Sequence, residues 1–230
     1  MITSIMQPTF LPSPIYLSLI YQADNFVFLD NVQFSKQSWQ QRNLIITKNG
    51  PLWITLPVLR KKNKIINKIE IDNKNKSIKK IVDSIKFAYS KKKYFSQYFP
   101  ELEKIILKDN KLLSNLNIKI IKWLCKSFNI RSNFFYAADL VDKIGEKDDK
   151  VERLIKMCKF LKTKIYLSPV GAKNYLFQFE EKFKKNDIKI EYNNFDLKPF
   201  EMSNSNPSAI DLLFCEGEMG LKKILKSING

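Results

Sequence analysis

The stretch that decides the fold is residues 2–31, which read ITSIMQPTFLPSPIYLSLIYQADNFVFLDN. Its start, Ile2 to Met6, predicts a short buried strand that ends at Gln7-Pro8, because proline cannot donate to a strand ladder. The apolar spacing from about Ile15 to Tyr21 predicts a helix, and Asn25 to Leu29 predicts a second buried strand. This order of strand, helix and strand is typical of a βαβ unit, so we expect a parallel sheet.

The rest of the chain adds a hairpin, a helical region and a second alternating region. Leu44 to Thr47, a turn at Asn49-Gly50 and Trp53 to Val58 predict the hairpin, and the apolar periodicity from about Ser77 to Phe128 is helical. The fold class is therefore α/β, with a mostly parallel sheet, a βαβ start, a β-hairpin insertion and a largely helical middle region. We expect one domain over residues 1–230 with a helical subdomain at about 75–130. Smaller predictions are a solvated loop at 60–64, a strand at 69–71 followed by a helix capped by Asp72 or Asn73, strands at 134–136, 164–167 and 188–192, an acidic loop at 142–149, and helices at 151–161, at about 173–184, at 209–214 and at the C-terminus.

The net charge of +17 is the strongest compositional signal. It invites a nucleic-acid interpretation, but only four of the 40 basic residues are arginines, and the chain is also rich in Asn and Ile. Such an excess is typical of mutational bias, whereas base readout and bidentate phosphate contacts favour Arg. Nucleic acid is thus the less favoured partner, and an anionic small molecule such as a nucleotide or sugar phosphate the more favoured one.

Cysteine usage and hydropathy indicate the cellular compartment of the protein. Cys125, Cys158 and Cys215 are odd in number and widely spaced, which suits reduced core thiols, and without histidine or a CxxC pair no metal site is evident. No apolar run is long enough for a membrane span, and the first residues lack the order of a signal peptide, so we expect a cytoplasmic protein.

Three loops follow predicted strands, where ligands of open α/β sheets bind. The first, from Gln7 to Pro14, offers Gln7 for hydrogen bonding and Phe10, with the nearby Tyr16, as apolar surface. The alternative is a proline-rich connection that packs on the core. In the third, from Ser168 to Asn174, Ser168 and the amides near Gly171 could hold an oxyanion, which is a weak signal.

The second loop, Asp30 to Asn43, concentrates amide, carboxylate and cationic groups around one tryptophan, as small-ligand sites do. Arg42 suits a bidentate phosphate or carboxylate contact, and the alternative is a structural pair with Asp30 or Asp24. The binding candidates of this loop are Asn31, Gln33, Lys36, Trp39, Arg42 and Asn43.

The absence of histidine excludes Ser-His-Asp and Cys-His triads. Acid–base chemistry would then fall to a carboxylate, a lysine, a tyrosine or the amine of the substrate. Asp30, at the end of a strand, is the first catalytic candidate, and Gln7 is the second.

These residues make the chain resemble the WbqC-like family of bacterial proteins, which are encoded in O-antigen and other surface-polysaccharide gene clusters. The resemblance runs nearly the full length, and it departs from the family pattern at Ser13-Pro14-Ile15, where an aromatic residue and a glycine are expected. Its motifs are Gln7-Pro8 with Phe10-Leu11-Pro12 and Tyr16, residues 23–27 and 30–34, Trp39 with Arg42-Asn43, residues 53–58, Tyr166-Leu167-Ser168 with Gly171 and Tyr175-Leu176, and residues 208–214.

The resemblance implies an enzyme that makes modified sugars for surface glycans, by N-acyl or aminoacyl (glycyl) transfer to a nucleotide-linked amino sugar. It adds Tyr175 to the binding candidates. The opening strand, loop, helix and strand are also similar to the ATP-binding start of nucleotidylyl transferases, one branch of which joins a carboxylic acid to an amine, although Tyr16 falls near the expected histidine. Two alternative functions therefore stay open. One is an ATP-dependent amide ligase, and the other is a non-catalytic basic protein that binds nucleic acid or a glycan assembly partner. The cofactor, ATP or another activated acyl donor, also stays open.

Overall fold

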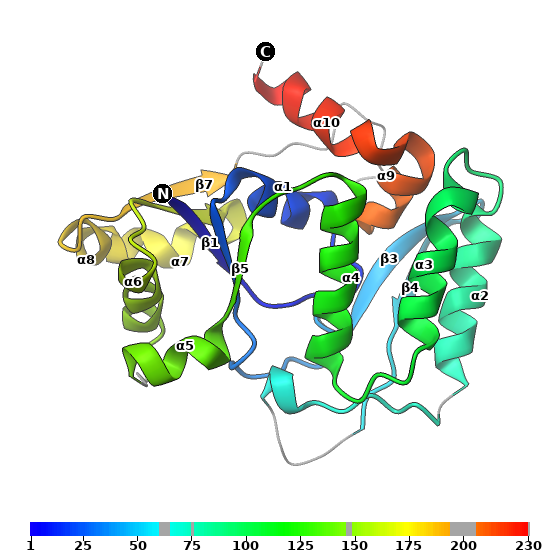
Figure 1. The fold of residues 1–230 in the computed structure, drawn as a ribbon, viewed down its shortest axis with the longest axis horizontal. Helices are drawn as coiled ribbons and strands as arrows, with labels where there is room; N and C mark the ends of the chain where they lie inside the picture. The colour runs from blue at the N-terminus through cyan, green and yellow to red at the C-terminus, as the bar shows by residue number, and fades with distance from the viewer. Residues whose placement is uncertain (60–64, 75, 146–148, 194–205, 230) are drawn as a thin grey trace. The chain divides into compact units, whose positions relative to one another are not determined.

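The computed structural model of the chain describes residues 1–59, 65–74, 76–145, 149–193 and 206–229. These residues form two compact units, each assembled from segments far apart in the sequence (Figure 1). The sheet unit comprises Met1–Gln7, Ser18–Asn31 and Arg131–Phe195. The helix–hairpin unit comprises Pro8–Leu17, Val32–Ile130 and Asp196–Gly230.

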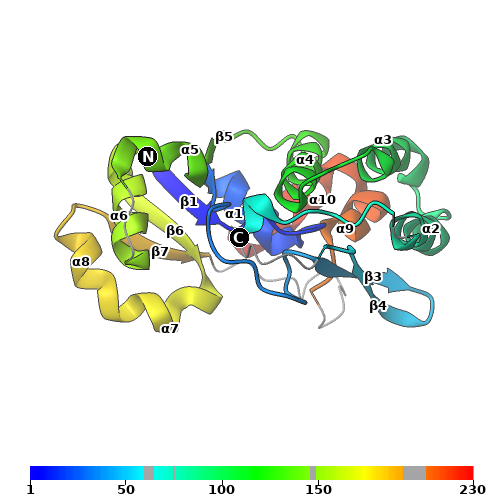
Figure 2. The same cartoon turned by 90° about the horizontal axis from the view of Figure 1, so that it is seen from below.

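The sheet unit contains a five-stranded parallel sheet in the order β5-β2-β1-β6-β7. Strands β1 and β2 pair from Thr3 with Asn25 to Met6 with Phe28, and helix α1 connects them along the chain, so the βαβ prediction is confirmed. Figure 2 shows β1, β6 and β7 beside one another, with α8 along β7. The elements are β1 (Ile2–Met6), the part of α1 (Pro14–Gln22) from Ser18 onward, β2 (Asn25–Phe28), β5 (Asn133–Tyr136), α5 (Ala137–Ile144), α6 (Lys150–Phe160), β6 (Ile165–Pro169), α7 (Lys173–Leu176), α8 (Glu180–Lys184) and β7 (Lys189–Asn193).

Helices α5, α6 and α8 supply most of the core on one face of this sheet. Ile5, Val27 and Tyr166 point to this face from neighbouring strands, as the two-residue alternation of a strand requires. The helices contribute Leu140, Ile155, Cys158 and Phe183, among others. The apolar runs at the start of the chain are therefore core strands.

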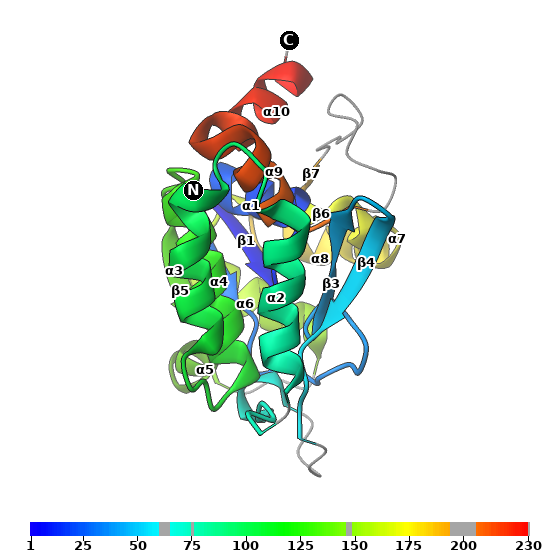
Figure 3. The ribbon, with the colours of Figure 1, turned by 90° about the vertical axis from the view of Figure 1, so that its right-hand side faces the viewer.

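The helix–hairpin unit combines helices with an antiparallel hairpin, and α2 lies beside β3 (Figure 3). The hairpin that Asn49-Gly50 predicts is present, with its turn one residue earlier, at Lys48-Asn49. Gly50 is the first residue of β4 and has a φ of 101°, which glycine adopts without a steric cost. Tyr89 and Phe95 meet Phe214 in the core, with ring centroids 5.3 Å apart in both pairs. The elements are β3 (Arg42–Thr47), β4 (Gly50–Thr55), α2 (Ser77–Tyr89), α3 (Phe95–Leu107), α4 (Leu113–Ser127), α9 (Ala209–Glu216) and α10 (Gly220–Asn229).

The structure corrects several local predictions. Asp72 and Asn73 do not cap α2, which begins after Lys76 without a side-chain cap. Residues 142–144 of the predicted acidic loop belong to helix α5, because Ala137 and Leu140 are buried on one side of it. The predicted helix at 173–184 is interrupted by a 3-10 turn at Phe177–Phe179, and Leu176 and Phe183 on either side of it are buried in the core.

Two further predictions concern residues 60–71. The predicted strand at 69–71 reduces to isolated bridges, from Glu70 to Leu112 and from Ile71 to Val58. The predicted loop at 60–64 lies outside the described residues.

The α/β fold class is confirmed, with a parallel sheet, a hairpin and a helical middle region. The single domain with a subdomain at about 75–130 stays a prediction. Within the described part of the chain, each helix is too short or too polar to pass through a bilayer.

Candidate functional site

The residues predicted for the site divide between the two units. Gln7, Asp30, Asn31, Ser168, Gly171 and Tyr175 belong to the sheet unit. Phe10, Tyr16, Gln33, Lys36, Trp39, Arg42 and Asn43 belong to the helix–hairpin unit.

An aromatic and cationic surface lies at the open end of the hairpin. Arg42 begins β3, and its guanidinium carbon lies 4.3 Å from the centroid of the Trp53 ring on β4. Trp39, in the turn before β3, lies 5.4 Å from Trp53 between ring centroids, at an interplanar angle of 41°. Each tryptophan side chain is 44% exposed, although indole rings are usually well covered. We call this surface the Trp39–Arg42–Trp53 face.

Arg42 is held by stacking rather than by an ion pair within its own unit. Its Nε atom is buried without a hydrogen-bond partner among the described residues. The two carboxylates weighed as structural partners belong to the sheet unit, where Asp24 accepts from Ile2 N–H at 2.8 Å and Asp30 accepts from Ala138 N–H at 3.0 Å. Among the described residues of its own unit, the Arg42 guanidinium therefore has a stacking partner, Trp53, but no carboxylate partner.

Buried amide side chains hold the backbone beneath this face. Asn43, which is 1% exposed, donates through Nδ2 to the carbonyls of Phe10 and Leu11 and accepts from Leu44 N–H at 2.7 Å. Asn117 on α4 donates to the carbonyls of Pro8, at 3.0 Å, and Gln40, at 2.8 Å. We call these two residues the amide clamp. It fixes the proline loop and the loop that carries Trp39.

Two glutamines complete this support. Gln40 accepts from Ser35 N–H at 3.0 Å, and Gln41 donates to the Leu56 carbonyl at 2.8 Å. Trp39 itself is attached to the proline loop, because its carbonyl accepts from Phe10 N–H at 2.9 Å. The backbone around Trp39 is thus bonded on both sides.

The other predicted residues of this unit lie either in the core or at the surface. Phe10 is fully buried, and Tyr16 is 5% exposed with its pKa raised well above its usual value by burial. The two rings therefore pack in the core, as the alternative interpretation of the proline loop expects. Gln33 and Lys36 are exposed on the loop before Trp39.

In the sheet unit, Asp30 lies at the carboxyl end of β2 and caps helix α5. Its carboxylate accepts from Ala138 N–H in the first turn of α5, where a negative charge is favoured. Asn31, the next residue, has a buried Oδ1 without a partner among the described residues, and Gln7 follows the neighbouring strand β1. This end of the sheet therefore presents a fixed carboxylate and amides.

Ser168 lies within β6 rather than after it, because the strand runs to Pro169. It is fully buried and is the register partner of Tyr192 on β7. Burial raises the pKa of Tyr166, two residues earlier on the same face, next to the hydroxyls of Ser168, Tyr192 and Tyr175. Gly171 and Tyr175 are exposed just beyond the strand.

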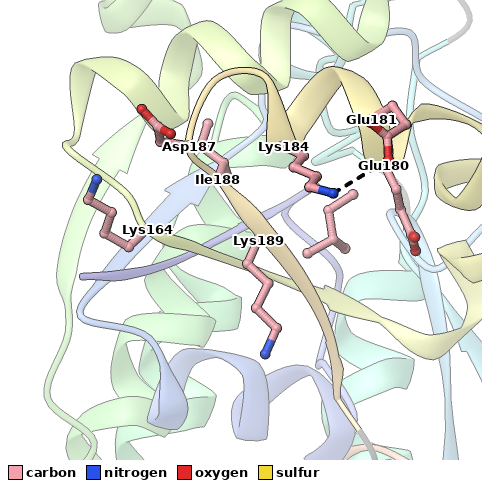
Figure 4. Close-up of a pocket in the computed structure, with 8 residues that line it drawn as sticks. Lys164, Glu180, Glu181, Lys184, Asp187, Ile188 and Lys189 are labelled. Atoms are coloured by element: carbon pink, nitrogen blue, oxygen red, sulfur yellow. Dashed lines mark ion pairs between the residues drawn. The ribbon is translucent and has the colours of Figure 1, made fainter.

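Two grooves open on the surface of the sheet unit. One, of about 610 Å³, lies between α8 and β7 and has three lysines and three carboxylates (Figure 4). The other, of about 350 Å³, lies between α6 and α8. It is lined by four lysines, Lys156, Lys159, Lys182 and Lys185, with Glu152, Ile155 and Asn186.

The cysteines are all reduced: Cys125 and Cys158 are buried, and Cys215 is partly exposed. Burial raises the pKa of both Cys125 and Cys158 to about 12, so these thiols are not nucleophiles near neutral pH. Among the described residues, no three cysteine, aspartate or glutamate side chains gather as metal ligands would.

Taken together, the fold and these side chains define an α/β protein with polar groups at the carboxyl end of a parallel sheet and an exposed Trp–Arg surface on a hairpin. The chain belongs to the WbqC-like protein family, whose model matches residues 7–223. It is 28% identical over 197 residues to an uncharacterized protein of Mycobacterium tuberculosis, a match that covers 84% of this chain and 82% of that protein.

Two residues of this site were not among the predicted site residues. Trp53 appears in the sequence only as part of a predicted strand and of the family motif at 53–58, although an aromatic residue on a hairpin strand opposite an arginine was a usable signal. Asn117 carries no such signal, because its partners lie 109 and 77 residues away in the sequence.

Proposed function

We propose that this protein is an enzyme of surface-polysaccharide biosynthesis that transfers an acyl or aminoacyl group to the amino sugar of a nucleotide-linked sugar. The observation that carries the proposal is the Trp39–Arg42–Trp53 face. Exposed indole rings stack on nucleobases and sugar rings, and a guanidinium binds phosphate in bidentate fashion. A nucleotide sugar contains all three of these groups.

The amide clamp supports the same proposal. A binding surface gains affinity when its side chains are already held in the bound arrangement. Here the Trp39 carbonyl accepts from Phe10 N–H, the neighbouring Gln40 carbonyl accepts from Asn117, and Asn43 holds the proline loop, so little order has to be imposed by a ligand. A loop that serves only solubility does not need such support.

The chemistry needs no histidine. The amine of the sugar attacks the acyl carbon of an activated donor, such as a thioester or an acyl phosphate, and forms the C–N bond. The bond to the leaving group breaks with its electron pair, and the proton of the amine passes to a carboxylate. We assign this proton to Asp30, whose orientation is fixed by Ala138 N–H, and Gln7, which follows the neighbouring strand β1, is the second candidate.

Binding is tested by tryptophan fluorescence. The chain has three tryptophans, and Trp123 is buried, so Trp123→Phe leaves the two surface indoles as the only reporters. We expect a nucleotide-linked amino sugar to quench this emission, and Trp53→Ala and Arg42→Ala each to weaken binding at least about fivefold with the fold intact. A panel of uridine, thymidine and guanosine diphosphate amino sugars that leaves the emission unchanged would remove the basis of the proposal.

The catalytic role of Asp30 is tested with two variants. Asp30→Asn keeps an oxygen that accepts from Ala138 N–H, whereas Asp30→Ala loses that bond as well. We expect the Asn variant to fold and bind normally but to lose amide formation, measured by mass spectrometry of the sugar nucleotide. Full activity in Asp30→Asn would show that Asp30 is only a helix cap.

The same assays separate the alternatives. A ligase of the ATP-dependent kind would release pyrophosphate or phosphate with a free carboxylic acid as the donor. A basic binding protein would bind single-stranded oligonucleotides in a strongly salt-dependent way, without a response to sugar nucleotides.

A further inference from the structure

The parallel sheet ends at β7, which has a hydrogen-bonding neighbour on one side only among the described residues. Lys189 N–H donates to the Lys164 carbonyl at 2.9 Å, so the backbone groups of Lys189 face β6. Because successive residues of a strand face opposite neighbours, the N–H and C=O groups of Ile190 and Tyr192 point to the open side. An open edge of this kind can pair with another strand.

The charges along β7 are self-complementary. The strand reads Lys189-Ile190-Glu191-Tyr192-Asn193. If a second β7 lies antiparallel with Ile190 opposite its own copy, Lys189 of each chain faces Glu191 of the other. Ile190 is also the residue whose backbone groups point outward, so the same register satisfies the backbone.

The groove beside this edge also has balanced charges. Its lining comprises Lys164, Lys184, Lys189, Glu180, Glu181 and Asp187 with two isoleucines, so positive and negative groups are equal in number (Figure 4). A surface with balanced charge meets its own copy around a twofold axis without a net repulsion, in spite of the overall charge of +17. The opposite edge strand, β5, has no charged residue and offers no such register.

We propose that the protein forms a twofold dimer through antiparallel pairing of β7, centred on Ile190, which joins the two parallel sheets into one continuous sheet. The Lys189–Glu191 pair of each chain, 2.8 Å apart, becomes part of a four-residue ionic network across the axis. This dimer is independent of the proposed enzymatic function.

Sedimentation velocity over protein concentrations up to about 0.3 mM, where small interfaces associate, tests the dimer. We expect concentration-dependent dimerisation of the wild type. Lys189→Glu and Glu191→Lys, each of which places like charges opposite one another twice, should each weaken it at least about tenfold. The double variant Lys189→Glu/Glu191→Lys restores opposite charges across the axis and should restore the dimer.

Lys79→Glu on α2 is the matched control, because it makes the same change in net charge at an exposed ion pair in the other unit. It should leave dimerisation unchanged. As a second measurement, Ile190→Cys in a Cys215→Ser background should form an intermolecular disulfide under mild oxidation, since the two copies of residue 190 face each other. A wild type that stays monomeric, or a double variant that fails to recover, overturns the proposal.

Discussion

Replacing Asn43 by alanine tests whether the amide clamp holds the site together. The side chain makes three hydrogen bonds in the structure, two donated to the carbonyls of Phe10 and Leu11 and one accepted from Leu44 N–H. Leu11 has a positive φ of 47°, a conformation that costs energy for a leucine and persists only where the surroundings fix it. The clamp therefore also maintains a strained backbone.

The magnitude follows from these bonds. A neutral hydrogen bond contributes about 1 kcal/mol net, and an abandoned buried polar group costs about 1–3 kcal/mol. With two buried carbonyls and one N–H affected, we expect Asn43→Ala to lower the free energy of unfolding by about 3 kcal/mol. For a chain of this size that corresponds to a fall in Tm of about 6–12 °C.

Urea unfolding followed by the fluorescence of the buried Trp123 measures the loss. Asn174→Ala, at an exposed position of α7, is the control and should leave the free energy of unfolding nearly unchanged. A loss below about 1 kcal/mol for Asn43→Ala would mean that water replaces the amide and that the clamp is not structural.

Two other predictions concern titratable groups. Burial raises the pKa of Asp211, which accepts a hydrogen bond from the Tyr89 hydroxyl, so the folded protein holds this proton to a higher pH than the unfolded chain does. The free energy of unfolding should therefore fall as the pH rises above the usual aspartate range of about 4. Asp211→Asn should flatten this pH dependence, measured as urea midpoints from about pH 4 to 7. If the pH dependence is unchanged in the variant, other titrating groups cause it. For the thiols, we expect one of the three cysteines, Cys215, to react with a disulfide reagent in the native protein and all three in urea, whereas rapid native labelling of Cys125 or Cys158 would contradict their burial.

The sequence predicts the elements whose burial is continuous and local. Strands β1 and β2 are rich in apolar residues and buried on both faces, so their place in a parallel sheet follows from residues 2–29 alone. Helix α5 was missed because part of its stability comes from Asp30, which accepts from Ala138 at a separation of 108 residues. A contact between residues so far apart in the sequence cannot be predicted from local sequence patterns.

The site shows the same limit. Composition picks out Asn43 and Arg42 alike as polar residues beside an aromatic one, but it cannot tell which of them faces solvent. The structure separates them: Asn43 is buried and bonded to backbone, whereas Arg42 is partly exposed and stacks on Trp53. Burial is a property of the packed unit, so this division could not be predicted from residues 30–43.

The different roles of the buried Asn43 and the stacked Arg42 also explain why a dense polar loop and an exposed aromatic surface occur together. Exposed tryptophans lose conformational freedom when they bind, and a mobile loop would add to that cost. Asn43 bonds the proline loop, Asn117 bonds the carbonyl of Gln40 next to Trp39, and Arg42 lies against Trp53, so the surface is ordered before any ligand arrives. Loss of the clamp should thus weaken ligand binding even though Asn43 and Asn117 are themselves buried and reach the ligand only through the backbone that they hold.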